Sequence, residues 1–520
     1  ASVSMTVAQH NAFNGTITAA GSETITLTTA GPATGLAAVE AYNLAAGDQT
    51  FTLGAASQNV TTSTGNITVN TGSIADITDS AINGTSATSL AIVLGATSDI
   101  SDAVITGTNG TQDADYSITI DGFNATLTRA QNSLITSATG TNTVTLADAG
   151  PATGNAAVEA YNLAAGDQTF TLGAASQNVT TSTGNITVNT GSIADITDSA
   201  INGTSATSLA IVLGATSDIS DAVITGTNGT QDADYSITID GFNATLTRAQ
   251  NSLITSATGT NTVTLADAGP ATGNAAVEAY VLATAGGSTF TLGSASQNVT
   301  TGTGGADTLN VSTYAATGTF NTVTADTIQL GNGANISGVN AEGAGVGTAL
   351  DADNLTIDAN ASVSMTVAQH NAFNGTITAA GSETITLTTA GPATGLAAVE
   401  AYNLAAGDQT FTLGAASQNV TTSTGNITVN TGSIADITDS AINGTSATSL
   451  AIVLGATSDI SDAVITGTNG TQDADYSITI DGFNATLTRA QNSLITSATG
   501  TNTVTLADAG PATGNAAVEA

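Results

Sequence analysis

The sequence predicts an all-β protein, a parallel β-solenoid (β-helix) built from repeats of about 120 residues. Three observations predict it: long exact internal repeats, short strand patterns separated by Gly, Asn and Asp, and an apolar content almost free of aromatic residues. The 520 residues are 41% hydrophobic but only 3% aromatic, with no Trp. The core must therefore be thin and made of small and β-branched side chains.

The repeats organise the whole chain. The motif "VEAY", or its start, occurs at residues 39, 158, 277, 399 and 518, so three spacings are 119 residues and one is 122. Residues 37–161 match residues 156–280 without a substitution, and residues 361–520 match residues 1–160. We divide the chain into the end of a diverged unit (1–38), repeat units (39–157, 158–276 and 399–517), a diverged unit (277–398) and the start of another unit (518–520).

Short alternating segments within each unit predict strands. They include "QTFTLG", "GNITVNTG", "YSITIDGFNATLT" and "NTVTLADAG", each bounded by turn residues. The diverged unit shows a shorter period, with three similar segments: "ADTLNV" starts at Ala306, "ADTIQL" at Ala325 and "ADNLTI" at Ala352. Thr128 could cap one helical turn in "TRAQNSLI", and "AAVEAYNLAA" could form a second.

Short strands that recur at close intervals, with many Gly and Asn turns, favour the solenoid. With a rung of about 19 residues, the chain would form about 27 rungs stacked about 4.8 Å apart, or roughly 130 Å. The alternative is a series of tandem β-sandwich domains, which normally need larger core residues and an aromatic anchor. Tyr42 and its copies are the candidates for that anchor.

Charge excludes several classes of partner. The chain has 40 acidic residues, three arginines and no lysine, for a net charge of -37. We therefore expect no nucleic-acid binding, because phosphate contacts need clustered Lys and Arg, and no binding to an anionic membrane. With no cysteine, disulfide-rich small domains and zinc ribbons are also excluded.

No apolar run of about 18 residues is present, so we expect no membrane insertion. The first residues, "ASVSMTVAQH", show no charged segment followed by an apolar core, so no signal peptide is visible within this sequence.

The segment "GTGGADTLNV", residues 302–311, resembles the calcium-binding nonapeptide of repeats-in-toxin proteins, G-G-x-G-x-D-x-U-x. Gly302, Gly305, Asp307 and Leu309 fit the pattern, while Thr303 replaces a Gly. The resemblance implies calcium held between stacked rungs, for which Asp326, in the next "ADT" segment after Asp307, is the stacked partner. The motif occurs once per 360-residue super-period rather than in tandem, and a plain tight turn is the competing interpretation.

A second acidic cluster, "QDADYSITIDG", supplies Asp113, Asp115 and Asp121 as further calcium candidates. The D-x-D spacing places two carboxylates on one side of an extended segment, and such oxygens suit a hard cation. The cluster lacks the terminal Glu of an EF-hand loop, so a solvated turn before a strand is the competing interpretation. "DADN", with Asp351 and Asp353, is the equivalent segment of the diverged unit.

The sequence gives little support for an enzyme. His10 and His370 are the same position in two copies, and Asn132 or Asn251 stands there in other units. A catalytic triad needs a base beside its nucleophile, and the sequence has no other histidine to act as that base. Paired carboxylates could serve a polysaccharide-cleaving enzyme, but every acidic residue is repeated whereas an active site is usually single. We predict no catalytic residue and no cofactor other than calcium.

Taken together, "VEAYNLAAGDQTFTLG", "SQNVTTGTGGADTLNV" and "TADTIQLGNGANISG" resemble the repeat regions of very large secreted bacterial surface proteins. These are the repeats-in-toxin-related adhesins, surface-layer proteins and appendage proteins. The resemblance implies an extracellular location at the bacterial cell surface. We predict a structural block of a fibre, appendage or surface layer that self-associates through stacked rungs. The alternative is the stalk of a giant calcium-dependent adhesin, and a contact with cell-surface glycans stays open in both.

Overall fold

The computed structural model describes residues 1–322, 325–339 and 354–519. It confirms an all-β parallel β-solenoid of about 26 turns, with rungs of about 19 residues and little helix. The chain forms two compact units, Ala1–Asn261 and Thr262–Ala520, and each is described separately below.

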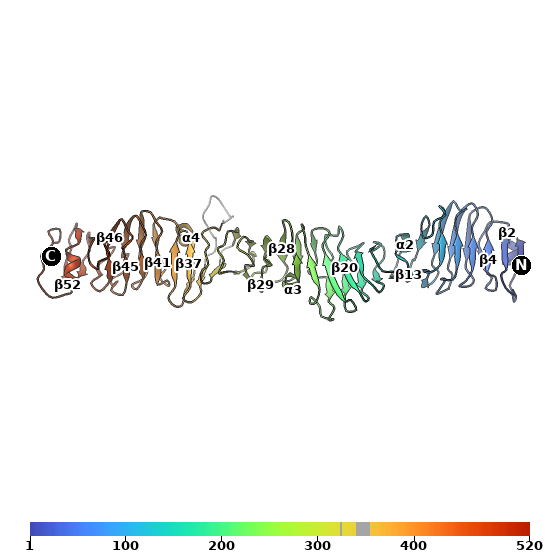
Figure 1. Cartoon of the computed structure of the whole chain (residues 1–520), viewed down its shortest axis with the longest axis horizontal. Coiled ribbons are helices and arrows are strands. Elements are labelled where there is room, and N and C mark those ends of the chain that lie inside the picture. Colours follow the sequence, from blue (N-terminus) through green and yellow to red (C-terminus); the bar gives the residue numbers. More distant parts are fainter. Residues whose placement is uncertain (323–324, 340–353, 520) are drawn as a thin grey trace. The chain divides into compact units, whose positions relative to one another are not determined.

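Between Thr24 and Val93 of the first unit, successive strands alternate between two sheets, so that one rung contributes one strand to each. The strands of a sheet lie side by side along the unit (Figure 1). The first sheet contains β1 (Ser2–Met5), β2 (Thr24–Leu27), β4 (Ala41–Asn43), β6 (Asn59–Thr61), β8 (Ala81–Asn83) and β11 (Val104–Thr106). The second contains β3 (Ala33–Thr34), β5 (Gln49–Thr52), β7 (Asn66–Asn70), β9 (Ser89–Val93), β12 (Ser117–Thr119) and β14 (Ile135–Ser137).

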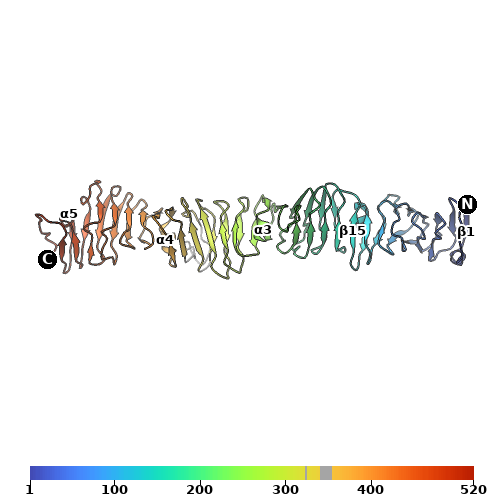
Figure 2. The ribbon, with the colours of Figure 1, turned by 90° about the horizontal axis from the view of Figure 1, so that it is seen from below.

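Two more sheets follow in the same unit, with β15 in the first of them labelled in Figure 2. One contains β10 (Ser98–Asp99), β13 (Ala125–Leu127), β15 (Thr143–Leu146), β17 (Ala160–Asn162), β19 (Asn178–Thr180), β21 (Ala200–Asn202) and β24 (Val223–Thr225). The other contains β16 (Ala152–Thr153), β18 (Gln168–Thr171), β20 (Asn185–Asn189), β22 (Ser208–Val212), β25 (Ser236–Thr238) and β27 (Ile254–Ser256).

All of these strand pairs are parallel, which rules out the alternative of tandem β-sandwiches, whose sheets are antiparallel. Register keeps buried residues in columns, because side chains alternate between the two faces of a strand. One column is Ile25, Tyr42, Val60, Ile82 and Ile105. Each of these is at most 6% exposed, so the column is a continuous apolar ladder.

The core is thin and mostly aliphatic, as predicted, but an aromatic pair interrupts it once per repeat. The rings of Tyr42 and Phe51 lie 4.7 Å apart, and those of Tyr161 and Phe170 lie 4.8 Å apart. All four side chains are at most 1% exposed. The segment "AAVEAYNLAA" therefore does not form the expected helical turn. The segment forms β4 instead, because Tyr42 pairs in register with Ile25 and lies in the buried apolar column.

The helical turn expected after Thr128 is confirmed. Thr128 caps α2 (Arg129–Asn132): its Oγ1 accepts the Gln131 amide at 3.1 Å and its own amide donates to Gln131 Oε1 at 2.9 Å. The other short helices have the same capping box: α1 (Val7–Asn11), α3 (Arg248–Asn251), α4 (Val367–Ala372) and α5 (Arg489–Asn492). Thr6 in the diverged unit therefore occupies the position of Thr128.

The second unit begins with the last residues of a repeat, 262–276, and continues with the diverged repeat. One of its sheets contains β29 (Pro270–Thr272), β31 (Thr289–Thr291), β33 (Thr308–Ser312), β35 (Thr327–Leu330), β36 (Asn354–Ile357) and β38 (Ile377–Thr378). Leu309 pairs with Ile328, and Ile328 pairs with Leu355. The three similar segments of the diverged unit, 19 and 27 residues apart, thus lie at the same place on three successive rungs. The exact copy at residues 361–520 then repeats the strand pattern of the first unit, from β39 (Thr384–Leu387) to β52 (Val504–Leu506).

Four of the five prolines lie where a sheet starts. All five lie in "GPAT", and four of these segments hold the first strand of a sheet: β3, β16, β29 and β40 (Ala393–Thr394). Proline has no amide hydrogen, so this position cannot donate to the rung before it. The strand that follows is therefore a sheet edge.

Candidate functional site

The first candidate metal ligands, Asp307 and Asp326, are fully buried and stacked on adjacent rungs. Asp326 Oδ1 accepts the amide of Asp307 at 2.8 Å, and Thr301 Oγ1 donates to its Oδ2. Asp307 Oδ1 and Oδ2 accept the amides of Ser288 and Gly302 at 2.7 and 2.8 Å. The predicted stacking of the two aspartates is present, and each of their carboxylate oxygens accepts an N–H or O–H from the protein.

The glycines of the toxin-like segment have a packing role. A Cβ on Gly302 would lie 2.0 Å from the carbonyl oxygen of Ala283, and a Cβ on Gly304 would lie 2.1 Å from that of Thr284. Only glycine allows the two backbones to come this close. The glycine pattern therefore reflects contact between rungs, and calcium binding at Asp307 stays a prediction.

Asp113 and Asp115 lie in the loop after β11, and both have left-handed backbones, with φ of 53° and 55°. Asp113 Oδ1 accepts the hydroxyl of Tyr116 at 2.8 Å and the side-chain amide of Gln131 at 3.2 Å. Burial, with a further contribution from the Asp113 charge, raises the pKa of Tyr116. Asp113 thus ties the loop to α2.

Asp121 has a separate role on the turn after β12. Its Oδ1 accepts the Ser137 hydroxyl and the Thr139 amide, each at 2.7 Å. These bonds, the Ser137 hydroxyl first, lower the pKa of the Asp121 carboxyl. Within the described ranges, no three His, Cys, Asp or Glu side chains are grouped so as to hold a metal ion. Asp351 and Asp353 lie outside those ranges.

The two histidines are buried inside the solenoid. His10 Nε2 lies 3.3 Å from the hydroxyl of Tyr42, and its Nδ1 lies 3.1 Å from Asn11 Oδ1. In a standard repeat Asn132 takes this place, and its Oδ1 accepts the Tyr161 hydroxyl at 3.0 Å. At this position either Asn or His is thus the polar partner of the buried tyrosine hydroxyl.

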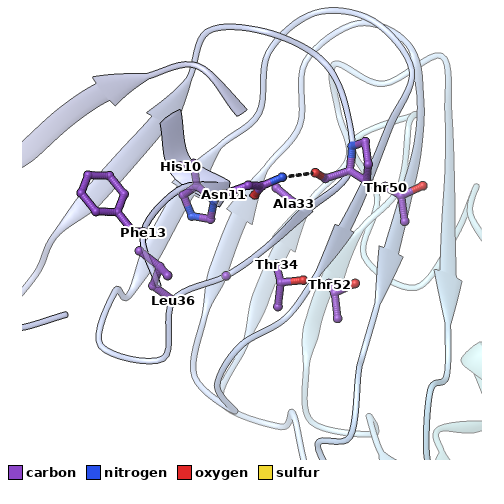
Figure 3. A pocket seen from close by; sticks show the side chains of 10 residues that line it. His10, Asn11, Phe13, Ala33, Thr34, Leu36, Thr50 and Thr52 are labelled. Atoms are coloured by element: carbon purple, nitrogen blue, oxygen red, sulfur yellow. Dashed lines mark hydrogen bonds between the residues drawn. The ribbon is translucent and has the colours of Figure 1, made fainter. Parts of the chain in front are cut away.

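A repeated surface groove was missed by the sequence analysis. It lies beside the first strand of a sheet, between the end of a short helix and the proline segment (Figure 3). The three described copies have volumes of about 500, 550 and 460 Å³ and centre on Pro32, Pro392 and Pro151. The sequence signal for this groove is the spacing of the prolines. Because proline has no amide hydrogen to donate to the preceding rung, the strand after it is left at a sheet edge.

Outward-facing threonines form the floor of the groove. In the copy around Pro32 they are Thr34, Thr50 and Thr52, with Thr34 paired to Thr52 across adjacent rungs. Pro32 is itself exposed, and its carbonyl accepts the side-chain amide of Asn11 at 2.9 Å. Figure 3 shows Thr34 and Thr52 side by side and Phe13 at the opposite rim.

Comparisons with protein-family models, with curated proteins and with solved structures find no match to this chain. Among residues 1–322, 325–339 and 354–519, no helix has the length and apolar character needed to cross a membrane.

Proposed function

We propose that this chain is a structural building block of an extracellular fibre, appendage or surface layer at a bacterial cell surface, and that it assembles through stacked β-rungs. Each rung buries its apolar columns only when another rung covers it, so the rung face is the natural surface of association. The exact repeats, the acidic surface and the absence of cysteine agree with a uniform exported material.

One observation carries this proposal: apolar side chains of a rung are buried by the rung stacked against it. Val363 and Phe373, the copies of Val3 and Phe13, are 1% and 5% exposed. The preceding rung bonds to the strand of Val363, because the amide of Ser364 donates to Ala334 O at 2.9 Å. Burying a large apolar side chain in this way stabilises stacking by about 1.5–3 kcal/mol.

The test is the assembly state of the purified chain, measured by light scattering and negative-stain electron microscopy over a range of concentrations. We expect concentration-dependent end-to-end association, which Val3→Asp combined with Phe13→Ser abolishes. Val104→Asp is the matched control, because Val104 is 48% exposed on the outer surface of β11 rather than on a rung face. A wild-type chain that stays monomeric at high concentration contradicts the proposal.

The second candidate is the stalk of a giant calcium-dependent adhesin, for which Asp307 and Asp326, buried and stacked on adjacent rungs, are the candidate calcium ligands. A stalk would remain monomeric, and calcium would raise its stability because the ion binds the folded state alone. The same samples, measured with calcium and with a chelator, therefore separate the two candidates.

A further inference from the structure

The groove is a neutral site in a strongly acidic chain. The chain carries a net charge of -37, yet the lining of the copy around Pro32 contains no Asp, Glu, Lys or Arg. Its one titratable residue, His10, is 1% exposed. In the copy around Pro151 the lining includes Arg129, whose Nε donates to Asp148 Oδ2 at 2.8 Å. The ligand of such a site is therefore not selected by charge.

The groove offers hydroxyl groups in a fixed pattern. The hydroxyls of Thr34, Thr50 and Thr52 form no hydrogen bond with the part of the chain that the structure describes, and the same holds for the threonines of the other two copies (Thr153, Thr169, Thr171, Thr394, Thr410 and Thr412). Paired threonines on adjacent strands lie about 4.8 Å apart, and threonines two residues apart on one strand lie about 6.8 Å apart. Each hydroxyl can both donate and accept.

The walls complement these hydroxyls with apolar surface. Pro32 is one of the lining residues, and Leu36 lies beside Phe13 at the rim. In the copy around Pro151, Asn155 takes the place of Leu36 and no aromatic residue lines the groove, so the proline and the alanine after it are the apolar residues that the copies share. An apolar wall with a few fixed polar groups, in a volume of about 500 Å³, is the usual composition of a small-molecule site. The ligand that fits has both hydroxyl groups and apolar C–H faces, and carries no negative charge that the surrounding field would repel.

We propose that each groove binds a short segment of a neutral polysaccharide. The threonine hydroxyls pair with sugar hydroxyls, while Pro32, or its copy Pro151 or Pro392, contacts the C–H face of a sugar ring. One groove binds weakly, because it is open and shallow. Several grooves on one chain, which share the proline and the three threonines, bind a long polymer more tightly, because each further contact is intramolecular. This gives the repeat unit a binding role besides its structural one.

The test is isothermal titration calorimetry of the full chain with maltohexaose, cellohexaose and mannohexaose, and with an anionic oligogalacturonate for comparison. We expect at least one neutral hexamer to bind with a Kd in the millimolar range or below, and no binding of the oligogalacturonate. If none of the three neutral sugars binds, or the anionic sugar binds best, the proposal is wrong.

A fourfold variant locates the binding. Thr52→Val, Thr171→Val, Thr291→Val and Thr412→Val remove one hydroxyl from each proline-linked position while keeping the β-branched shape. We expect it to weaken binding by about tenfold. The matched control replaces the outward threonines of the opposite sheets, Thr61, Thr180, Thr300 and Thr421, with valine. Equal affinity for the fourfold variant and wild type, or an equal loss in the control, overturns the assignment.

Discussion

Arg129 and Asp148 are joined twice across adjacent rungs. The backbone amide of Arg129 donates to Asp148 Oδ1 at 2.7 Å, and its Nε donates to Oδ2 at 2.8 Å. In the diverged unit the same two positions hold Val7 and Thr29, and the Val7 amide donates to Thr29 Oγ1 at 3.0 Å. Both pairs therefore supply an acceptor to the first amide of the helical turn, and the ion pair is an addition.

The first prediction concerns this acceptor. Asp148→Ala should destabilise the turn at Arg129 by about 1 kcal/mol, the usual cost of losing a helix cap, because a half-exposed ion pair adds little. The measurement is hydrogen exchange at the amides of residues 129–134. The double variant Arg129→Val with Asp148→Thr recreates the pair of the diverged unit and should exchange more slowly than Asp148→Ala. Equal exchange in the two variants would contradict the role given to the acceptor.

The second prediction concerns the aromatic pair. Phe170 is fully buried against Tyr161, so Phe170→Ala should cost about 3–5 kcal/mol through lost packing and a cavity. Because each rung contacts only its neighbours, faster hydrogen exchange should be confined to strands near β18. The control is Thr169→Ala on the same strand; its side chain is exposed, and we expect a change within about 0.5 kcal/mol. A loss spread evenly over the chain would contradict nearest-neighbour stability.

The third prediction separates capping from calcium binding at Asp307. Asp307→Asn replaces one of two acceptors with a donor, so the amide of Ser288 or Gly302 loses its buried partner, at a cost of about 1–3 kcal/mol. If the carboxylate is a backbone cap, this loss is the same with calcium and with a chelator. Calcium that stabilises the wild-type chain but not the variant would instead assign Asp307 to a metal site.

The sequence predicted the solenoid because its signals are local. Alternating segments such as "QTFTLG" and "ADTIQL" each form a strand. The successive "AD" segments of the diverged unit lie on successive rungs, which brings Leu309, Ile328 and Leu355 into register. Thr128 with Gln131 as the third residue of the turn predicts its helix equally directly. Periodicity and capping need no tertiary information.

The candidate sites were predicted less well, because they depend on what faces each residue from the next rung. Asp307, Asp113 and Asp121 look alike as acidic positions, yet their partners are backbone amides, a tyrosine hydroxyl and a serine hydroxyl. The groove lies beside Pro32, at the edge of a sheet. That edge can be recognised only once the rungs are stacked. The sequence around Tyr42 predicts a helical turn, but the segment forms a strand. Tyr42 is buried because it pairs in register with Ile25 of the preceding rung, which the local sequence does not show.

The last prediction is that acid lowers the stability of the chain in two steps, the first of which His370 causes. Burial lowers the pKa of the His370 imidazole, which contacts the Tyr402 hydroxyl and Asn371 Oδ1. The unfolded chain therefore takes up this proton more readily, and stability falls as the pH drops below about 6.5. Hydrogen bonds lower the pKa of carboxyls such as Asp76 and Asp121, chiefly those from Thr78 and Ser137. Their contribution is present above the unfolded pKa and is lost only as the pH falls below about 4.

His370→Asn isolates the first step, because the chain itself places Asn132 at the equivalent buried position. Hydrogen exchange at the amides of residues 366–372, followed from pH 7 to pH 4.5 and corrected for the intrinsic effect of pH, should show loss of protection in the wild type. The variant should keep that protection until the carboxyls titrate. Loss of protection at the same pH in both chains would show that His370 is not the group responsible, since asparagine takes up no proton in this range.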